Sequence, residues 1–170
     1  MKRILFLAML AAALLPIGTA TAQSLSARAR SLDGDTIAIN LRIAGIDAFE
    51  RRQRCEPRPG QCQACGKQAQ DYLARLLRDR DTAIVLRPEA SHGRPVVTAS
   101  VAGRDVGLAM IEAGFAIARP DYLRDDPARA TRYRDAYRRA LAAKRGAFVG
   151  RWVDPARWRR GERLACEKRQ

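Results

Sequence analysis

Residues 33–50 read DGDTIAINLRIAGIDAFE, a stretch in which apolar residues alternate with smaller or polar ones. This alternation has the two-residue period of a β-strand with one buried face. The sequence therefore predicts a strand that begins near Leu32. The apolar residues expected on its buried face are Ile37, Ile39, Leu41 and Ile43.

The same stretch holds four carboxylates and one arginine, which we expect at the ends of two strands. Oxygen-rich clusters of this type suit a hard cation such as Ca²⁺, which binds several carboxylate and carbonyl oxygens. A DGDT sequence is also an ordinary turn between strands, so the cluster by itself has a structural interpretation as well. Its members are Asp33, Asp35, Asp47 and Glu50, with Arg42.

Further along the chain, the periodicity predicts an amphipathic helix over residues 66–79, followed by strands over 82–86 and 95–101. A short helix over 105–113 and an apolar segment over 115–118 come next. Asp126 and Pro127 have the residue types of a helix start, and that helix is expected to run to Gly146. This order favours an α+β fold, a small barrel with helices packed on it, over a parallel α/β sheet.

The composition indicates one exported, basic domain. The chain has 170 residues, room for one domain, and its 47% hydrophobic and 29% charged content excludes a disordered or fibrous chain. Basic residues outnumber acidic ones by 32 to 18, which favours a polyanionic partner such as nucleic acid. A solvated, arginine-rich surface explains the same excess without a partner.

The first 22 residues predict a cleaved signal peptide. Lys2 and Arg3 precede an apolar run over residues 4–17, and the sequence ATA at 20–22 fits a cleavage site after Ala22. The run is too short to span a membrane. We therefore expect a periplasmic or secreted monomer without stable membrane insertion, with a domain over 23–150 and a C-terminal tail, residues 151–170, docked on it.

Four cysteines lie in the exported part, which favours two disulfides in an oxidising compartment. Three pairings are open; we expect Cys55–Cys65 within a loop and Cys62–Cys166 to hold the tail. Two alternatives remain. Residues 62–65 have the CxxC spacing of thiol oxidoreductases, and a zinc site could use all four cysteines, or three with His92.

A second polar motif, SHGR at residues 91–94, places a glycine where a tight turn would present Arg94. Two arginines and a metal suit phosphodiester cleavage, because they bind the nonbridging oxygens and neutralise the charge of the transition state. A carboxylate would orient the attacking water. The tail also holds Trp158-Arg159-Arg160, which could contact nucleic acid, although packing of the tryptophan is the simpler interpretation.

Together these motifs resemble the staphylococcal nuclease (thermonuclease) family over roughly residues 30–150. The resemblance rests on DGDT at 33–36, RIAGIDAFE at 42–50, HGR at 92–94 and GRDVGLAMIEAGFA at 103–116. It implies a five-stranded OB-fold barrel with about three packed helices. It also implies a Ca²⁺-dependent endonuclease that hydrolyses DNA, RNA or both, with another divalent cation as an alternative.

The resemblance also implies a role for each polar residue of the motifs. Asp35, Asp47 and the backbone carbonyl of Ala48 would bind the metal, with Asp33 supporting them from outside the ligand set. Glu50 would act as the general base. The remaining expected site residues are Arg42 and Arg94 on the phosphate, and His92 and Tyr122 on the substrate.

One departure from the family concerns the hairpin between the first metal ligand and the first arginine. Arg42 follows Asp35 by only seven positions, fewer than is usual in the family. A shorter hairpin would move Arg42 away from the position that it has in the family. A second class of function therefore stays open: a non-catalytic OB-fold module that binds nucleic acid or another polyanion. The complete set of five polar side chains favours the enzyme, because binding alone does not require it.

Overall fold

The computed structural model describes residues 25–168, so the predicted signal peptide, residues 1–22, lies outside the described residues. The strands are β1 Ala29–Ser31, β2 Ile37–Ile39, β3 Arg42–Ile43, β4 Ile46–Ala48, β5 Cys55–Arg58, β6 Gln61–Gln63, β7 Thr82–Ser91, β8 Arg94–Val101, β9 Arg104–Asp105 and β10 Ala116–Ala118. The helices are α1 Cys65–Leu77, α2 Val106–Glu112, α3 Pro127–Ala142, α4 Pro155–Arg159 and α5 Ala165–Lys168. Single 3₁₀ turns occur at η1 Pro120–Tyr122 and η2 Gly146–Phe148.

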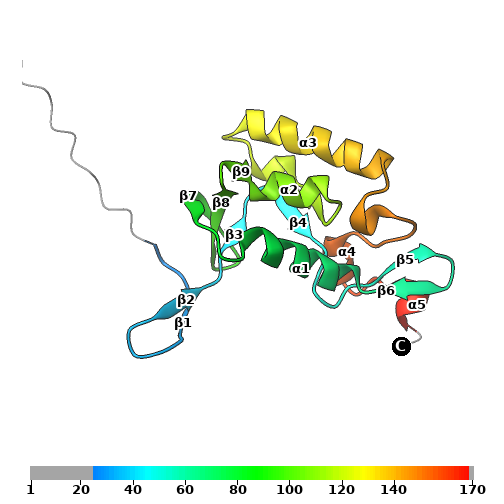
Figure 1. Cartoon of the computed structure of the whole chain (residues 1–170), viewed down its shortest axis with the longest axis horizontal. Helices are drawn as coiled ribbons and strands as arrows, with labels where there is room; N and C mark the ends of the chain where they lie inside the picture. Colours follow the sequence, from blue (N-terminus) through cyan, green and yellow to red (C-terminus); the bar gives the residue numbers. More distant parts are fainter. Residues whose placement is uncertain (1–24, 169–170) are drawn as a thin grey trace, which may run out of the picture.

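β8 is the central strand of the main sheet, and the long β7 pairs with it in antiparallel orientation at one edge (Figure 1). β3 adds to β8 in parallel, and β9 pairs with β8 in antiparallel orientation. β4 pairs instead with β10, so that Asp47 lies opposite Ile117. The remaining strands form the separate hairpins β1–β2 and β5–β6.

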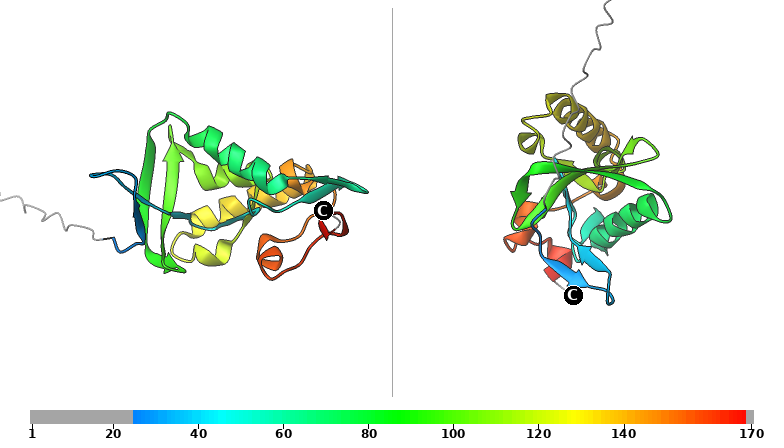
Figure 2. Two further views of the ribbon diagram at one scale, coloured as in Figure 1. Left: turned by 90° about the horizontal axis from the view of Figure 1, so that it is seen from below. Right: turned by 90° about the vertical axis from the view of Figure 1, so that its left-hand side faces the viewer.

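The expected α+β class is confirmed, but the strand pairs of residues 25–168 do not close into one barrel. The short connection after Asp35 explains part of this difference. β2 ends at Ile39, and β3 begins at Arg42 and has only two residues, so the β1–β2 pair stays a separate ribbon. In Figures 1 and 2 this ribbon lies at the opposite end of the molecule from α5.

The three helices expected from periodicity are present with end positions close to the predicted ones. Asp105 caps α2 by accepting a hydrogen bond from the Leu108 amide at 2.9 Å. Asp126 caps α3 in the same way, with the Arg129 amide at 2.9 Å, and Pro127 takes the first helical position as expected. The two helices of the C-terminal tail, α4 and α5, are additions to the predicted set.

The core lies between α2, α3 and the strands that they cover. Tyr133 of α3 is fully buried, and its hydroxyl donates a hydrogen bond to Asp105 Oδ1 at 2.6 Å. Burial and this hydrogen bond raise the pKa of Tyr133 above its ordinary value, so the phenol stays neutral. This tyrosine is therefore a core residue rather than a surface for stacking bases.

The cysteines form Cys55–Cys65 and Cys62–Cys166, which is the pairing expected from the sequence. No thiol is left free among residues 25–168, so the structure supports neither a reduced CxxC motif nor a zinc–thiolate site. Cys62–Cys166 links the C-terminal segment, defined here as residues 151–168, to β6. The segment also packs through Trp152, whose ring lies 5.8 Å from Phe49 and 5.4 Å from Phe148.

In the part of the chain from 25 to 168, no helix has both the length and the apolar character needed to cross a bilayer.

Gly107 of α2 offers a test of the α2–α3 packing. A Cβ atom at this position would lie 2.3 Å from the Tyr133 hydroxyl, so Gly107→Ala forces two buried groups apart. We expect a loss of about 1–3 kcal/mol in the free energy of unfolding, although alanine is the better helix former. Gly34→Ala, where nothing lies within 4 Å of the added atom, is the control. Equal urea midpoints for the two variants would contradict this packing.

Candidate active site

A cleft opens where β3, β4 and the start of β8 meet α4, and it collects four of the predicted polar residues. The glycine turn between β3 and β4 shapes it. Gly45 has φ +69°, and a Cβ there would lie 2.3 Å from buried Leu123, so only glycine fits. The polar side chains that line the cleft, together with the Ala48 backbone, come from Arg42, Asp47, Glu50, Arg94 and Arg159.

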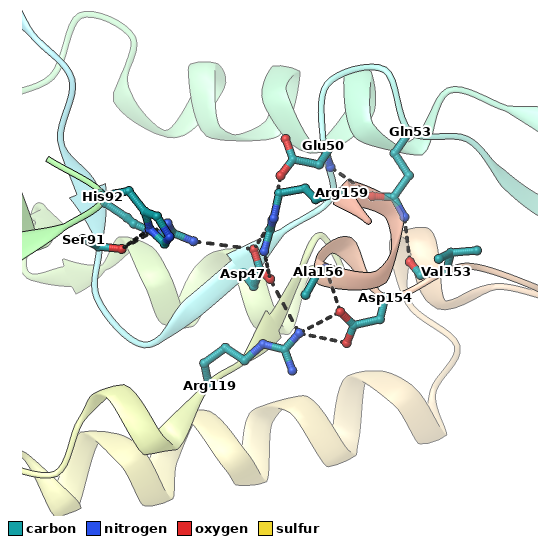
Figure 3. A network of polar contacts seen from close by, with 11 residues as sticks. Asp47, Glu50, Gln53, Ser91, His92, Arg119, Val153, Asp154, Ala156 and Arg159 are labelled. Atoms are coloured by element: carbon teal, nitrogen blue, oxygen red, sulfur yellow. Dashed lines mark hydrogen bonds and ion pairs between the residues drawn. The ribbon is translucent and has the colours of Figure 1, made fainter. Parts of the chain in front are cut away.

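Asp47 is the buried centre of this cleft, with 7% of its surface exposed. Arg159 of α4 binds both of its carboxylate oxygens, with Nη1 2.9 Å from Oδ1 and Nη2 2.8 Å from Oδ2 (Figure 3). This is the paired geometry in which a planar guanidinium matches a carboxylate. The two residues are 112 positions apart in the chain.

Two further guanidinium groups face the same carboxylate. Arg119 Nη2 lies 3.5 Å from Asp47 Oδ2, and Arg42 Nη2 lies 3.9 Å from Oδ1. Arg119 also binds both oxygens of Asp154, at 2.9 and 2.8 Å. A buried carboxylate is costly unless it is compensated, and these three arginines provide the compensation.

Glu50 lies next to Asp47 and shares the same arginine. Its Oε1 accepts a hydrogen bond from Arg159 Nη1 at 2.7 Å. Its backbone amide donates to Gln53 Oε1 at 3.1 Å, and the buried Gln53 donates in turn to the Val153 carbonyl at 2.6 Å. The turn that carries Glu50 is therefore bound to the C-terminal segment.

Arg159 remains a cation at any pH at which the protein is folded. Its hydrogen bond to Asp47 raises the pKa of the guanidinium, burial opposes this effect, and the bond to Glu50 adds to it.

The turn between β7 and β8 brings the second motif to the cleft. Arg94 lines the cleft and is exposed. Arg42 Nη1 donates to Ser91 Oγ at 3.2 Å, and His92 Nδ1 lies 3.2 Å from the same oxygen. His92 is therefore close to Arg42 and outside the set of cleft-lining residues.

Three of the predicted residues lie apart from the cleft. Asp33 and Asp35 are in the exposed turn of the β1–β2 hairpin, which Figure 1 shows projecting from the body. Asp33 Oδ1 accepts from the Thr36 amide at 2.7 Å, and the hydrogen bonds from Thr36 and Asp35 lower the pKa of Asp33. Tyr122 of η1 is 72% exposed and does not line the cleft.

The donor set of this arrangement does not fit a Ca²⁺ site. Among the side chains that the structure describes, those of residues 25–88 and 91–168, no group of three or more His, Cys, Asp or Glu is placed to hold a metal ion. Ca²⁺ binds about 6–8 oxygen atoms. In the cleft both Asp47 oxygens and one Glu50 oxygen already accept hydrogen bonds from Arg159, and Asp35 is on a different part of the surface.

A family model described as Staphylococcal nuclease homologue matches residues 40–149. The chain belongs to the staphylococcal nuclease family. Membership implies an OB-fold, a nuclease activity on nucleic acid and a general dependence on divalent cations. No curated protein matches the chain significantly.

The matched region of this nuclease homologue contains Arg42, Asp47, Glu50 and Arg94. Asp35 lies before the matched region and Arg159 after it. The two unexpected features of the site, the absence of Asp35 from the cleft and the presence of Arg159 in it, therefore both concern residues outside the match. Sequence reasoning missed Arg119, Gln53 and the contact of Arg159 with the carboxylates. The only signal for Arg159 was its place in the run Trp158-Arg159-Arg160, which carries no period.

Asp154 offers a pH-dependent test of how α4 is held. Burial alone would raise its pKa, but hydrogen bonds from Arg119 and the Ala156 amide outweigh burial and lower that pKa below 3.8. A carboxyl whose pKa is lower in the folded state stabilises the fold at pH values above its unfolded-state pKa. This stabilisation is lost as the pH falls through the folded-state pKa.

We therefore expect Asp154→Asn to lower the free energy of unfolding by about 1–2 kcal/mol at pH 7, and the difference from wild type to shrink at pH 3. Urea unfolding at the two pH values measures this. Asp121→Asn, at an exposed position, is the control. A deficit of the same size at both pH values would show that the charge of Asp154 has no such role.

Proposed function

We propose that this protein is an exported nuclease that hydrolyses DNA, RNA or both, as an endonuclease, in the periplasm or outside the cell. The observation that carries the proposal is the cleft in which Arg42 and Arg94 lie beside the carboxylates of Asp47 and Glu50, all within the region that matches the family. The net charge of +14 supports a polyanionic substrate.

In this proposal the two arginines act on the scissile phosphate. Arg94 is exposed at the cleft, and Arg42 is half-buried and held by Ser91. Guanidinium groups bind nonbridging phosphate oxygens through paired hydrogen bonds, and they stabilise the charge that develops when water adds to phosphorus. The new P–O bond to water forms as the bond to the leaving sugar oxygen breaks; the water gives up a proton, and the leaving oxygen takes one from solvent and departs as an alcohol.

Glu50 is the proposed general base. Its carboxylate is partly exposed at the cleft, and its backbone is fixed by Gln53, so it can orient a water molecule and accept its proton. Glu50 Oε1 accepts a hydrogen bond from Arg159 Nη1, which occupies that oxygen. The proposed reaction therefore requires this bond to open.

A divalent cation, with Ca²⁺ as the expected ion, belongs to the proposal because the family generally depends on one. Asp47 and the Ala48 carbonyl are the groups in the cleft that would bind it, and it would supply positive charge to the phosphate. Since these groups and Asp35 do not form a ligand set as arranged, no catalytic step is assigned to the ion.

One observation favours the alternative, a non-catalytic module that binds nucleic acid or another polyanion. Arg159 covers both candidate acidic groups, and the cleft with Arg159 present is rich in cations. Such a surface binds phosphate without cleaving it.

Glu50→Gln separates the two functions. We expect this variant to lose cleavage of denatured DNA and of RNA by about 100-fold or more, because the amide cannot accept the proton, and to keep the DNA affinity of the wild type. Purified oxidised protein would be assayed with Ca²⁺ and with chelator. Glu162→Gln, on the surface of the C-terminal segment, is the control.

Cleavage that persists in Glu50→Gln would exclude Glu50 as the base. Salt-sensitive DNA binding without cleavage under any divalent ion would establish the binding module instead.

A further inference from the structure

We propose that Arg51 and Arg52 form a second phosphate-binding element, which holds a single strand of nucleic acid at the phosphates next to the scissile one. Both residues follow Glu50 directly, and neither lines the cleft. The inference rests on the proposed function in one respect only, which is that it takes nucleic acid as the partner.

The Glu50 turn, defined here as residues 50–53, is closed by hydrogen bonds. The Gln53 amide donates to the Glu50 carbonyl at 2.7 Å. The fully buried Gln53 side chain accepts from the Glu50 amide and donates to the Val153 carbonyl, as Figure 3 shows. The two residues between Glu50 and Gln53 are Arg51 and Arg52, and both are exposed. The turn therefore displays two arginines from a fixed backbone.

The start of α1 holds the same turn from another side. The Gly66 amide donates to the Gln53 carbonyl at 3.0 Å, and Gly66 leaves no room for a Cβ atom, which would overlap the Glu50 carbonyl oxygen. Cys55, two positions after the turn, is joined by a disulfide to Cys65 at the first position of α1. Because the backbone of the turn is already ordered, binding a ligand there costs little further loop entropy.

The side chains of Arg51 and Arg52 are not used by the fold. Within the part of the chain that the structure describes, neither has a hydrogen bond or an ion pair. Other exposed arginines are engaged, as Arg157 is with Glu162 at 2.6 Å. A guanidinium without a carboxylate partner keeps all of its donors for phosphate oxygens.

The place of the turn decides which phosphates it reaches. Glu50 lines the cleft, and successive Cα atoms are about 3.8 Å apart, so the Cα atoms of Arg51 and Arg52 lie within about 8 Å of that of Glu50. In the proposed function the scissile phosphate lies beside Glu50, on Arg42 and Arg94. The phosphates next to it on the strand are therefore the ones within reach of the turn.

The charges of the cleft leave this pair of arginines uncompensated. Asp47 and Glu50 are the carboxylates of the cleft, and both accept hydrogen bonds from Arg159. Arg51 and Arg52 thus add positive charge at the edge of the cleft. Each phosphate that such a group neutralises releases a counterion from the nucleic acid, so the contact is visible in the salt dependence of binding.

The test measures binding of a single-stranded DNA of about 12 nucleotides by fluorescence anisotropy over a range of salt concentrations. The buffer contains chelator, and the DNA is checked to be intact afterwards. Wild type is compared with Arg51→Gln/Arg52→Gln and with Arg138→Gln/Arg139→Gln. The second variant is the matched control, because it removes two adjacent exposed arginines from α3, which lies on the far side of α2 from α1 (Figures 1 and 2).

We expect Arg51→Gln/Arg52→Gln to bind this DNA about tenfold more weakly than wild type at about 0.1 M salt. The slope of log affinity against log salt should become shallower by about 1.4, since each phosphate contact on a single strand contributes about 0.7. The Arg138→Gln/Arg139→Gln control should keep the slope and the affinity of wild type. Equal slopes and affinities of the two double variants would overturn the inference.

Arg51→Lys/Arg52→Lys is the conservative variant, which keeps both charges. We expect its salt slope to match that of wild type, because a lysine that contacts a phosphate also releases a counterion. A slope as shallow as that of Arg51→Gln/Arg52→Gln would contradict a role of these charges. Urea unfolding of each variant checks that it is folded.

The outcome can be separated from that of the proposed activity. Selective weakening in Arg51→Gln/Arg52→Gln without cleavage by any variant would retain the binding element and reject the nuclease. Cleavage by wild type with equal affinities of the two double variants would do the reverse. Where both hold, Arg51→Gln/Arg52→Gln should raise KM and leave kcat near that of wild type, because the contact is made equally in the ground state and the transition state.

Discussion

The hydrogen-bonded pair of Asp47 and Arg159 is the contact on which the arrangement of the cleft depends. Asp47 lies in β4, which pairs with β10, and its side chain is buried. Burying an ionised carboxylate costs several kcal/mol unless positive groups surround it. Arg42 comes from β3, Arg119 follows β10, and Arg159 comes from α4. One buried charge therefore brings three distant parts of the chain together.

The C-terminal segment reaches that charge because covalent and polar constraints act together. Cys62–Cys166 closes a loop with a sequence separation of 104, and bridges over long loops stabilise a fold by about 2–5 kcal/mol in the chain-entropy account. Asp154 adds a helix cap and an ion pair with Arg119. The arginine-rich composition thus has a structural use at the cleft, in addition to any role toward nucleic acid.

Local sequence patterns predicted the elements that are long enough to show a period. The stripe over 66–79 predicted α1, and the Asp126-Pro127 pair predicted the start of α3. Helices α4 and α5 have five and four residues, which is too short for a period to be visible. The motif residues of the cleft were also predictable, since they come from two short stretches whose strand ends meet in the fold.

Asp35 and Arg159 show why the rest of the site could not be read from motifs. The DGDT motif specifies a turn, but the direction of that turn depends on the length of the strands that follow, and only two residues separate the end of β2 from the start of β3. The contact of Arg159 joins positions 112 apart, which no local pattern encodes.

The character of the cleft follows from which cation holds its carboxylates. A guanidinium is planar and donates hydrogen bonds, whereas Ca²⁺ collects oxygens around a point charge. With Arg159 on Asp47 and Glu50, the two carboxylates of the cleft are bound by a planar hydrogen-bond donor and not by an ion. Arg159 therefore sets the charge balance of the cleft, in which three arginines and two carboxylates lie together.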